Sequence, residues 1–157
     1  MALEIRHRDA MEADFPTPFM TRTHSNVEPL NAALKKLILE LRATSPSVTR
    51  YTSNRGGFQT DAGFVNRQEP AVQALAQMIG HATRAFYDRY IPAELSVRMT
   101  KCRLNVWGWA VVMQASDLNS RHHHPDSNVS GVYYVDLPPR PATADPMEGA
   151  IVFSDPR

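Results

Sequence analysis

Three consecutive histidines, His122 to His124, stand in the stretch NSRHHHPDSNVSGVYYV at residues 119–135. Neutral imidazole is a common protein ligand of Fe, Zn, Cu and Ni. In an extended backbone, side chains two residues apart point to the same side, so His122 and His124 would project together while His123 faces the other way. The H-x-H pair is therefore a candidate metal site that offers two imidazoles to one ion.

Asp126 offers a second way to build such a site. Two histidines and one carboxylate on one face of an octahedron are the usual ligands of non-haem Fe(II) oxygenases. His124, Pro125 and Asp126 form an H-x-D pair, and spacing alone does not separate this pair from H-x-H. A regular strand would place His122 and Asp126 about 13 Å apart, at ~3.3 Å per residue, which is too far for one ion. Either Pro125 bends the chain, or the third ligand comes from another strand.

A competing interpretation involves no metal. The histidines and Asp126 would then form a solvated polar loop ahead of a strand, and replacing His122 or His124 would change neither metal binding nor stability. Elsewhere, His81 stands in a helical segment without a partner in sequence, and we interpret it as a surface or hydrogen-bonded core histidine. Cys102 is the single cysteine, interpreted as a buried apolar thiol.

The composition narrows the class of protein. A chain of 157 residues has the length of a single domain, 1–157. Its 17 basic and 16 acidic side chains leave a net charge of +1, which favours neither nucleic acid nor an anionic membrane as partner. The charged N-terminal stretch MALEIRHRDAMEADF lacks the apolar run of a signal peptide, so we expect a cytoplasmic protein.

Two amphipathic helices are expected within about residues 25–91. In SNVEPLNAALKKLILELRA, Ser25 and Glu28 have capping-box spacing and leucines recur at helical intervals. EPAVQALAQMIGHATRAFYDRY carries a proline in its first turn and stops before Pro92. Between the helices, SNRGGFQTDAG at residues 53–63 is rich in turn formers and predicts a loop.

From about residue 96 onward the pattern changes to that of strands. SVRMTKCRLNVWGWAVVM, VSGVYYVDL and AIVFS mix β-branched, aromatic and alternating residues. Helices followed by a run of strands predict an α+β fold, or a β-sandwich or barrel with N-terminal helices. We place the β part at about residues 96–157 of the same domain.

Several separated motifs occur together in this chain. HHHPDSNVSGVYYV is similar to a segment H-x-H-P-x-S-x-x-S-G-V-Y-Y, and IVFSDPR is similar to a later segment F-x-D-P-R. FPTPF at residues 15–19, SNRGGFQT at residues 53–60 and Trp109 stand where the same family has similar residues. In this order the motifs, which span nearly the whole chain, resemble a bacterial and phage family of 2-oxoglutarate- and Fe(II)-dependent oxygenases.

The resemblance implies a double-stranded β-helix, a jelly roll whose facing sheets hold the metal, with the two N-terminal helices packed on one sheet. It implies that His122 and His124 are the metal positions, with Fe(II) as the ion, and it leaves Asp126 as the alternative ligand. The implied reaction consumes 2-oxoglutarate and O₂, releases succinate and CO₂, and hydroxylates a substrate that the sequence does not name.

The resemblance also places Trp109, Tyr133 and Tyr134 in strands that line or support the pocket. Alternation allows only one of the two tyrosines to face it. Tyr134 is our candidate for contacting the cosubstrate, although aromatic core packing is the competing role for each of the three rings.

The chain departs from the family pattern at several points. Val111 stands where asparagine is expected, and Ser116 stands near an expected glycine. Relatives continue past F-x-D-P-R into strands with a distal histidine and a basic residue that holds 2-oxoglutarate, whereas this chain stops at Arg157. We therefore expect an incomplete jelly roll without its C-terminal strands, with activity only once the domain is completed. Asp155 is a remote candidate for the third ligand.

An unfinished sheet would expose strand edges, so a homodimer is possible on this interpretation. The competing class of protein is a non-enzymatic, cupin-like module that binds a metal or a partner through H-x-H without redox chemistry.

Overall fold

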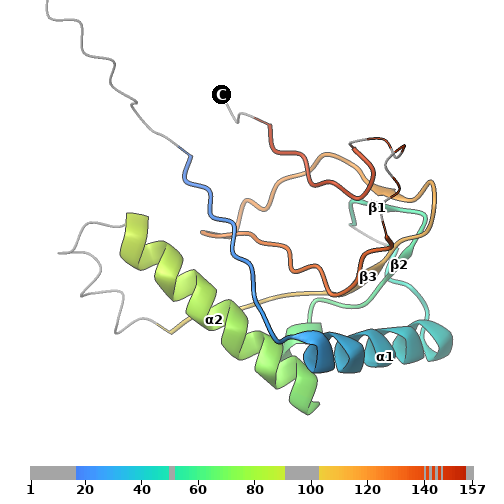
Figure 1. Cartoon of the computed structure of the whole chain (residues 1–157), viewed down its shortest axis with the longest axis horizontal. Coiled ribbons are helices and arrows are strands. Elements are labelled where there is room, and N and C mark those ends of the chain that lie inside the picture. Colours follow the sequence, from blue (N-terminus) through green and yellow to red (C-terminus); the bar gives the residue numbers. More distant parts are fainter. Residues whose placement is uncertain are drawn as a thin grey trace, which may run out of the picture.

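The computed structural model describes residues 17–49, 52–90, 103–139, 141, 143, 145 and 147–154. In chain order the elements are α1 (Glu28–Thr44), β1 (Asn54–Arg55), β2 (Phe58–Gln59), the 3₁₀ helix η1 (Phe64–Asn66), α2 (Pro70–Tyr90), β3 (Val111–Val112) and β4 (Leu118–Asn119) (Figure 1). Two helices with small antiparallel sheets confirm the predicted α+β class. Cys102 and Asp155 lie outside the described residues.

Both predicted helices are present, although α1 begins differently from the prediction. The residue before α1 is Val27, and no side chain caps the helix, so the predicted capping box of Ser25 and Glu28 is wrong. Proline in the first turn and the acidic Glu28 favour the helix start instead. At the other end, the backbone N–H of Ser45 donates to Leu41 O at 2.8 Å and closes the last turn.

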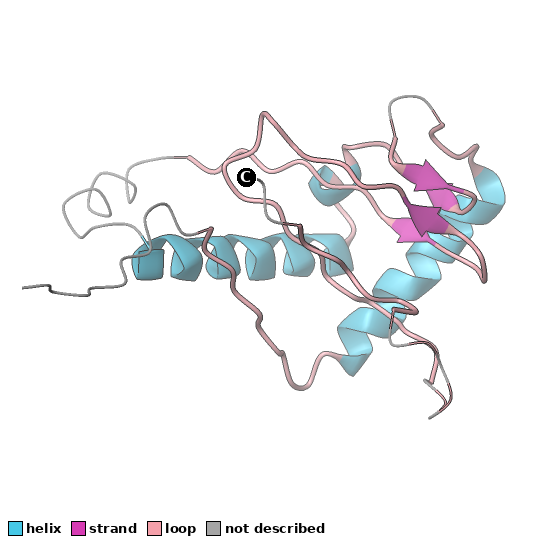
Figure 2. Cartoon of the chain, turned by 90° about the horizontal axis from the view of Figure 1, so that it is seen from above, coloured by secondary structure: helices cyan, strands magenta, loops and turns pink. Residues whose placement is uncertain are grey.

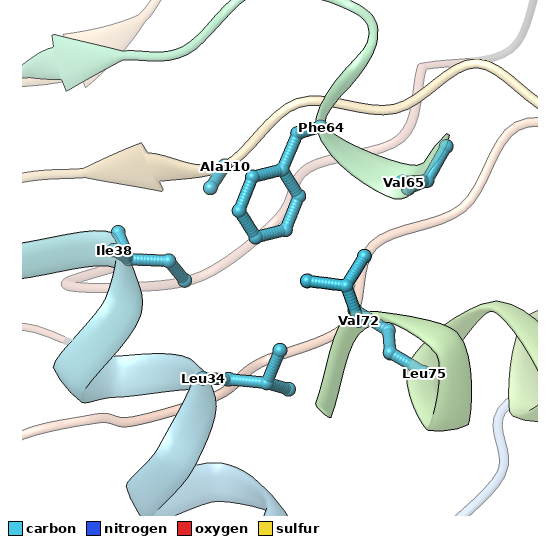
Figure 3. Close-up of a cluster of buried hydrophobic side chains, with 7 residues drawn as sticks. All are labelled: Leu34, Ile38, Phe64, Val65, Val72, Leu75 and Ala110. Carbon is cyan, nitrogen blue, oxygen red and sulfur yellow. The ribbon is translucent and has the colours of Figure 1, made fainter. Parts of the chain in front are cut away.

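The core lies where α1, α2 and η1 meet. Its buried side chains interlock between the two helices and the 3₁₀ turn (Figure 3); they are Leu34, Ile38, Phe64, Val65, Val72, Leu75 and Ala110. Leu34 and Val72 are completely buried, and each contributes about 1.5–3 kcal/mol by leaving water. The helices thus pack mainly against each other and η1, and Ala110, next to β3, joins them from the β part.

The segment 52–60 runs antiparallel to the segment 110–120 as one interrupted ladder. β1 pairs with β4, Asn54 opposite Asn119, and β2 pairs with β3, Phe58 opposite Val112. Figure 2 shows the strands gathered at one end of the molecule, beside α1. The prediction of a loop over residues 53–63 is therefore wrong for β1 and β2, because these strands form through a partner about sixty residues away rather than through local preference.

A tight turn interrupts this ladder. Gly56 and Gly57 lie opposite residues 113–117, and Gly56 has a φ of +89°. A Cβ atom on Gly56 would lie 1.8 Å from Asp117 Oδ1, so only glycine fits. Ser116, which stands near the glycine expected from the family pattern, has a φ of +73°, a conformation that glycine adopts most easily.

The C-terminal strand predictions are wrong for the described residues. Residues 129–137 and 150–154 contain no paired strand, and most of this part is extended loop (Figure 2). Within residues 129–137, the two neighbouring tyrosines nevertheless point to opposite sides, as alternation predicts. Tyr133 packs against the core while Tyr134 is 43% exposed. Tyr133 also donates a hydrogen bond of 2.6 Å to Asn31 Oδ1, which ties the segment to α1.

A jelly roll is not visible in the described part of the chain, which contains two sheets of two strands each. The described residues do not show the expected packing of both helices on one sheet. The two helices contact each other, and α2 also contacts η1. Among the described residues, neither helix has the length and the apolar character that a membrane crossing requires.

Candidate functional site

A pocket of about 440 Å³ lies beside the interrupted ladder. One side comes from the chain before and along β2, and the other from Trp109 and the segment after β4. The lining residues are Val48, Thr52, Ser53, Gln59, Thr60, Asp61, Ala62, Trp109, Ser120, His122, His123 and His124. The pocket therefore gathers the histidine cluster and polar residues from two segments that are far apart in the sequence.

His122 is oriented by the end of the ladder. Ser120 donates both its backbone N–H and its hydroxyl to Ser53 O, at 2.8 and 3.0 Å. His122 Nδ1 lies 2.8 Å from Ser120 O. Because a carbonyl oxygen only accepts, the neutral imidazole must carry its proton on Nδ1, which leaves the Nε2 lone pair free. Metal-binding histidines commonly donate their other ring N–H to a backbone carbonyl in this way, which fixes the tautomer.

His124 lies against Trp109, with ring centroids 5.7 Å apart. The backbone beside Trp109 is fixed by two hydrogen bonds between Ala110 and Thr60. Thr60 N–H donates to Ala110 O and Ala110 N–H donates to Thr60 Oγ1, both at 3.0 Å. Partial burial lowers the pKa of His124, and the nearby charges of His122 and His123 lower it further. A lowered pKa favours the neutral imidazole, the form that binds metal.

The rings of His122 and His124 are close enough to share one ion. Their centroids are 4.8 Å apart and their planes are 89° apart. Imidazole nitrogens lie about 2.0–2.1 Å from a bound transition metal, so two ligands of one ion have ring centroids roughly 4.5–5.5 Å apart. The predicted H-x-H pair is therefore brought together, with its ring centroids within the range expected for two ligands of one ion.

His123 does not behave as strand alternation predicted. It also contributes to the pocket lining. Residues 121–127 are not a strand, and Ser127 N–H donates to His124 O at 3.1 Å in a turn. The strict alternation of an extended backbone is lost there, so His123 is not confined to the opposite side.

The other candidates lie outside this pocket. Asp126 is exposed in the turn after His124 and is not among the lining residues. The Tyr134 hydroxyl donates to Gly149 O at 3.3 Å, also away from the lining. In the described ranges, no group of three or more His, Cys, Asp and Glu side chains could hold a metal ion. The side chains at the pocket that most readily bind a metal are thus the imidazoles of the histidine cluster and the carboxylate of Asp61.

The sequence prediction missed one polar wall of the pocket. This wall consists of Thr52, Ser53, Gln59, Thr60 and Asp61. A signal was present in SNRGGFQT at residues 53–60, which we interpret as similar to the family pattern and which lies outside the matched residues 108–157. The turn-forming composition of this segment predicts a loop and does not indicate that its residues line the site.

These features define an α+β protein with a pocket that is lined by three imidazoles and several polar side chains. Residues 108–157, which are 50 of the 157 residues, match the model of a family described as "Putative 2OG-Fe(II) oxygenase". The match confirms the predicted family resemblance for this segment, which contains Trp109, His122 and His124. No curated protein and no solved structure matches the chain.

Proposed function

We propose that this chain acts in a non-haem Fe(II)- and 2-oxoglutarate-dependent dioxygenase, with His122 and His124 as two of the metal ligands. The observation that carries the proposal is the pair of imidazole rings 4.8 Å apart, at the pocket within the segment that matches the oxygenase family. The proposal also includes the jelly-roll fold that the family implies and a third metal ligand.

Bound Fe(II) would supply the oxidative decarboxylation of 2-oxoglutarate by O₂ that drives hydroxylation of a substrate C–H bond. The residues of this chain orient the ion. Ser120 O holds the Nδ1 proton of His122, so Nε2 is presented to the metal. Trp109 covers one side of His124 and restricts the access of water to that ring.

The third ligand is a separate part of the proposal. Asp126 is the alternative ligand, and its exposed position in the turn after His124 requires the turn to rearrange before the carboxylate reaches a shared ion. Tyr134 would have to release Gly149 O before its hydroxyl could contact 2-oxoglutarate. Neither residue is needed for the first two metal contacts.

Anaerobic addition of Fe(II) and 2-oxoglutarate tests the proposal. We expect the visible charge-transfer band of the iron chelate to develop, and we expect His122→Ala and His124→Ala each to remove it. His81→Ala is the matched control, because His81 is exposed on α2 and does not line the pocket. A band of unchanged intensity in both pocket variants would show that the iron binds elsewhere.

A metal-binding module without redox chemistry is the second candidate. It is favoured by the absence, within the described part of the chain, of a cluster of three potential ligands. A two-imidazole site completed by water suits Zn(II) or Ni(II) as well as iron. Tight Zn(II) or Ni(II) binding that depends on His122 and His124, with no charge-transfer band, would select this function over the dioxygenase.

A further inference from the structure

The pocket that contains the histidines is also lined by a negatively charged side chain. Of its lining residues, the one with a permanently charged side chain at neutral pH is Asp61, and neither lysine nor arginine is among them in the described part of the chain. The remaining polar lining consists of hydroxyl and amide groups from Thr52, Ser53, Gln59 and Thr60. Such a wall attracts a positively charged or hydrogen-bond-donating group, whereas an anionic group such as 2-oxoglutarate would find its partners on the other side, at the imidazoles and the ion that they hold.

The backbone holds Asp61 in place. Its Oδ1 atom accepts a hydrogen bond of 2.6 Å from Gly63 N–H. A Cβ atom at Gly63 would lie 2.8 Å from the same oxygen, so glycine allows this close approach. On the other side, Thr60 Oγ1 donates to Asp61 O at 3.2 Å. The carboxylate is thus positioned before any ligand arrives, and the residue stays exposed to solvent.

Asp61 is also separate from the metal donors. It lines the same pocket as His122 and His124, yet it does not form with them a group that could hold a metal ion. Its negative charge is thus a candidate partner for a cationic ligand in the same pocket.

Trp109 adds a second group that favours cations. Its side chain is 39% exposed and lines the same pocket. The electron-rich face of an indole attracts an ammonium or guanidinium group within about 6 Å. A carboxylate binds an ammonium group by a charge-assisted hydrogen bond and an indole binds it through its ring face, so both groups of this pocket favour cationic nitrogen.

We propose that this pocket takes a substrate with a protonated amine, bound by the Asp61 carboxylate and the Trp109 indole. This inference rests on the proposed function, because it names the substrate class of the same site. A pocket of about 440 Å³ is within the usual range of about 300–1,000 Å³ for small-molecule sites. With its ammonium group at Asp61, the carbon chain of the substrate extends along the wall toward His122 and His124.

Binding is tested first without metal or cosubstrate, by ligand-observed NMR titration at pH 8. Three five-carbon probes share a terminal hydroxyl and differ in the group at the other end: 5-amino-1-pentanol is a cation, 1,5-pentanediol is neutral and 5-hydroxypentanoate is an anion. We expect the amine to bind at least tenfold more tightly than the diol, and the carboxylate to bind more weakly than the diol.

Asp61→Asn and Asp61→Ser are the key variants. Each keeps an oxygen that can accept the Gly63 N–H bond and removes the charge, so the turn is preserved, as circular dichroism and thermal unfolding would verify. We expect both to reduce amine binding about tenfold and to leave diol binding unchanged. Trp109→Leu should weaken amine binding as well. Glu40→Gln, which removes an exposed carboxylate on α1 outside the pocket, is the matched control and should change neither.

Equal binding of amine and diol, or an equal loss of both in the Asp61 variants, would overturn the inference. Loss of Fe(II) binding in Asp61→Asn with unchanged amine binding would overturn it too, since Asp61 would then be a metal ligand. The two proposals fail separately. Selective amine binding without the charge-transfer band would refute the dioxygenase and retain the amine site, whereas the band without amine selectivity would do the reverse.

Discussion

Thr60 and Ala110 join two segments fifty residues apart through reciprocal hydrogen bonds, Thr60 N–H to Ala110 O and Ala110 N–H to Thr60 Oγ1, each 3.0 Å long. Both residues are buried. Their neighbours Asp61 and Trp109 line the candidate pocket. This pair therefore connects the core of the fold to the walls of the site.

Thr60→Val should destabilise the protein by about 1–3 kcal/mol, because valine has the shape of threonine and leaves the buried Ala110 N–H without its acceptor. Chemical denaturation measures the change. Thr44→Val is the matched control: the Thr44 hydroxyl donates to Glu40 O at an exposed site, and its loss should change the free energy of unfolding by less than about 0.5 kcal/mol. Equal effects of the two variants would contradict the structural role of the pair.

The pKa of His124 should lie below its ordinary value of 6.5, because partial burial, and then the charges of His122 and His123, disfavour the protonated ring. Proton titration by NMR measures it directly. In His122→Gln the pKa should rise but stay below 6.5, since the desolvation remains. A value at or above 6.5 in the wild-type protein would contradict the structure.

The same shift predicts how stability depends on pH. Because the folded pKa of His124 is depressed, the unfolded chain takes up the proton first as the pH falls. The contribution of His124 is therefore complete above pH 6.5 and is lost as the pH falls through the lowered pKa. Denaturation midpoints of the wild-type protein and His124→Gln, measured from pH 7.5 to pH 5, should converge at the acidic end. Parallel curves would indicate that His124 does not contribute.

Gly56→Ala should be destabilising by about 1–3 kcal/mol, because the new methyl group would overlap the Asp117 side chain and the φ of +89° strains any side chain. Gly80→Ala is the matched control. A Cβ atom at Gly80 meets nothing within 4 Å, and alanine in the interior of α2 should stabilise the helix by about 0.5–1 kcal/mol. Thermal unfolding of the two variants should therefore shift in opposite directions, and a shift in the same direction would show that the turn at Gly56 is absent in solution.

Leu34→Ala should cost about 2–5 kcal/mol, since Leu34 is completely buried at the contact between α1 and α2. Leu39 lies on the same helix and is 42% exposed, so Leu39→Ala should cost much less. Urea denaturation of the two variants compares them directly. Similar losses would mean that α1 buries a different face.

The helices could be predicted because their signals are local. Leucines at helical intervals and a proline in the first turn occur within each segment, and the structure places α1 and α2 where these patterns predicted them. Alternation predicted that only one of the two tyrosines faces inward, but it did not say which: Tyr133 packs on the core, whereas Tyr134, our candidate for the cosubstrate contact, is exposed. The strands predicted over residues 129–137 and 150–154 were wrong, because a strand also needs a hydrogen-bonding partner, and its own residues do not specify one.

The sequence by itself determined the helices, the histidine cluster and the family resemblance, since each depends on residue types at short spacing. Only the tertiary structure decided that segment 52–60 pairs with segment 110–120. That pairing brings Asp61 and Gln59 to the pocket beside His122 and His124, and it holds Trp109 against His124. The physical reason is that the paired strands join residues more than fifty positions apart, and local preferences carry no information about which distant backbone will satisfy a strand's hydrogen bonds.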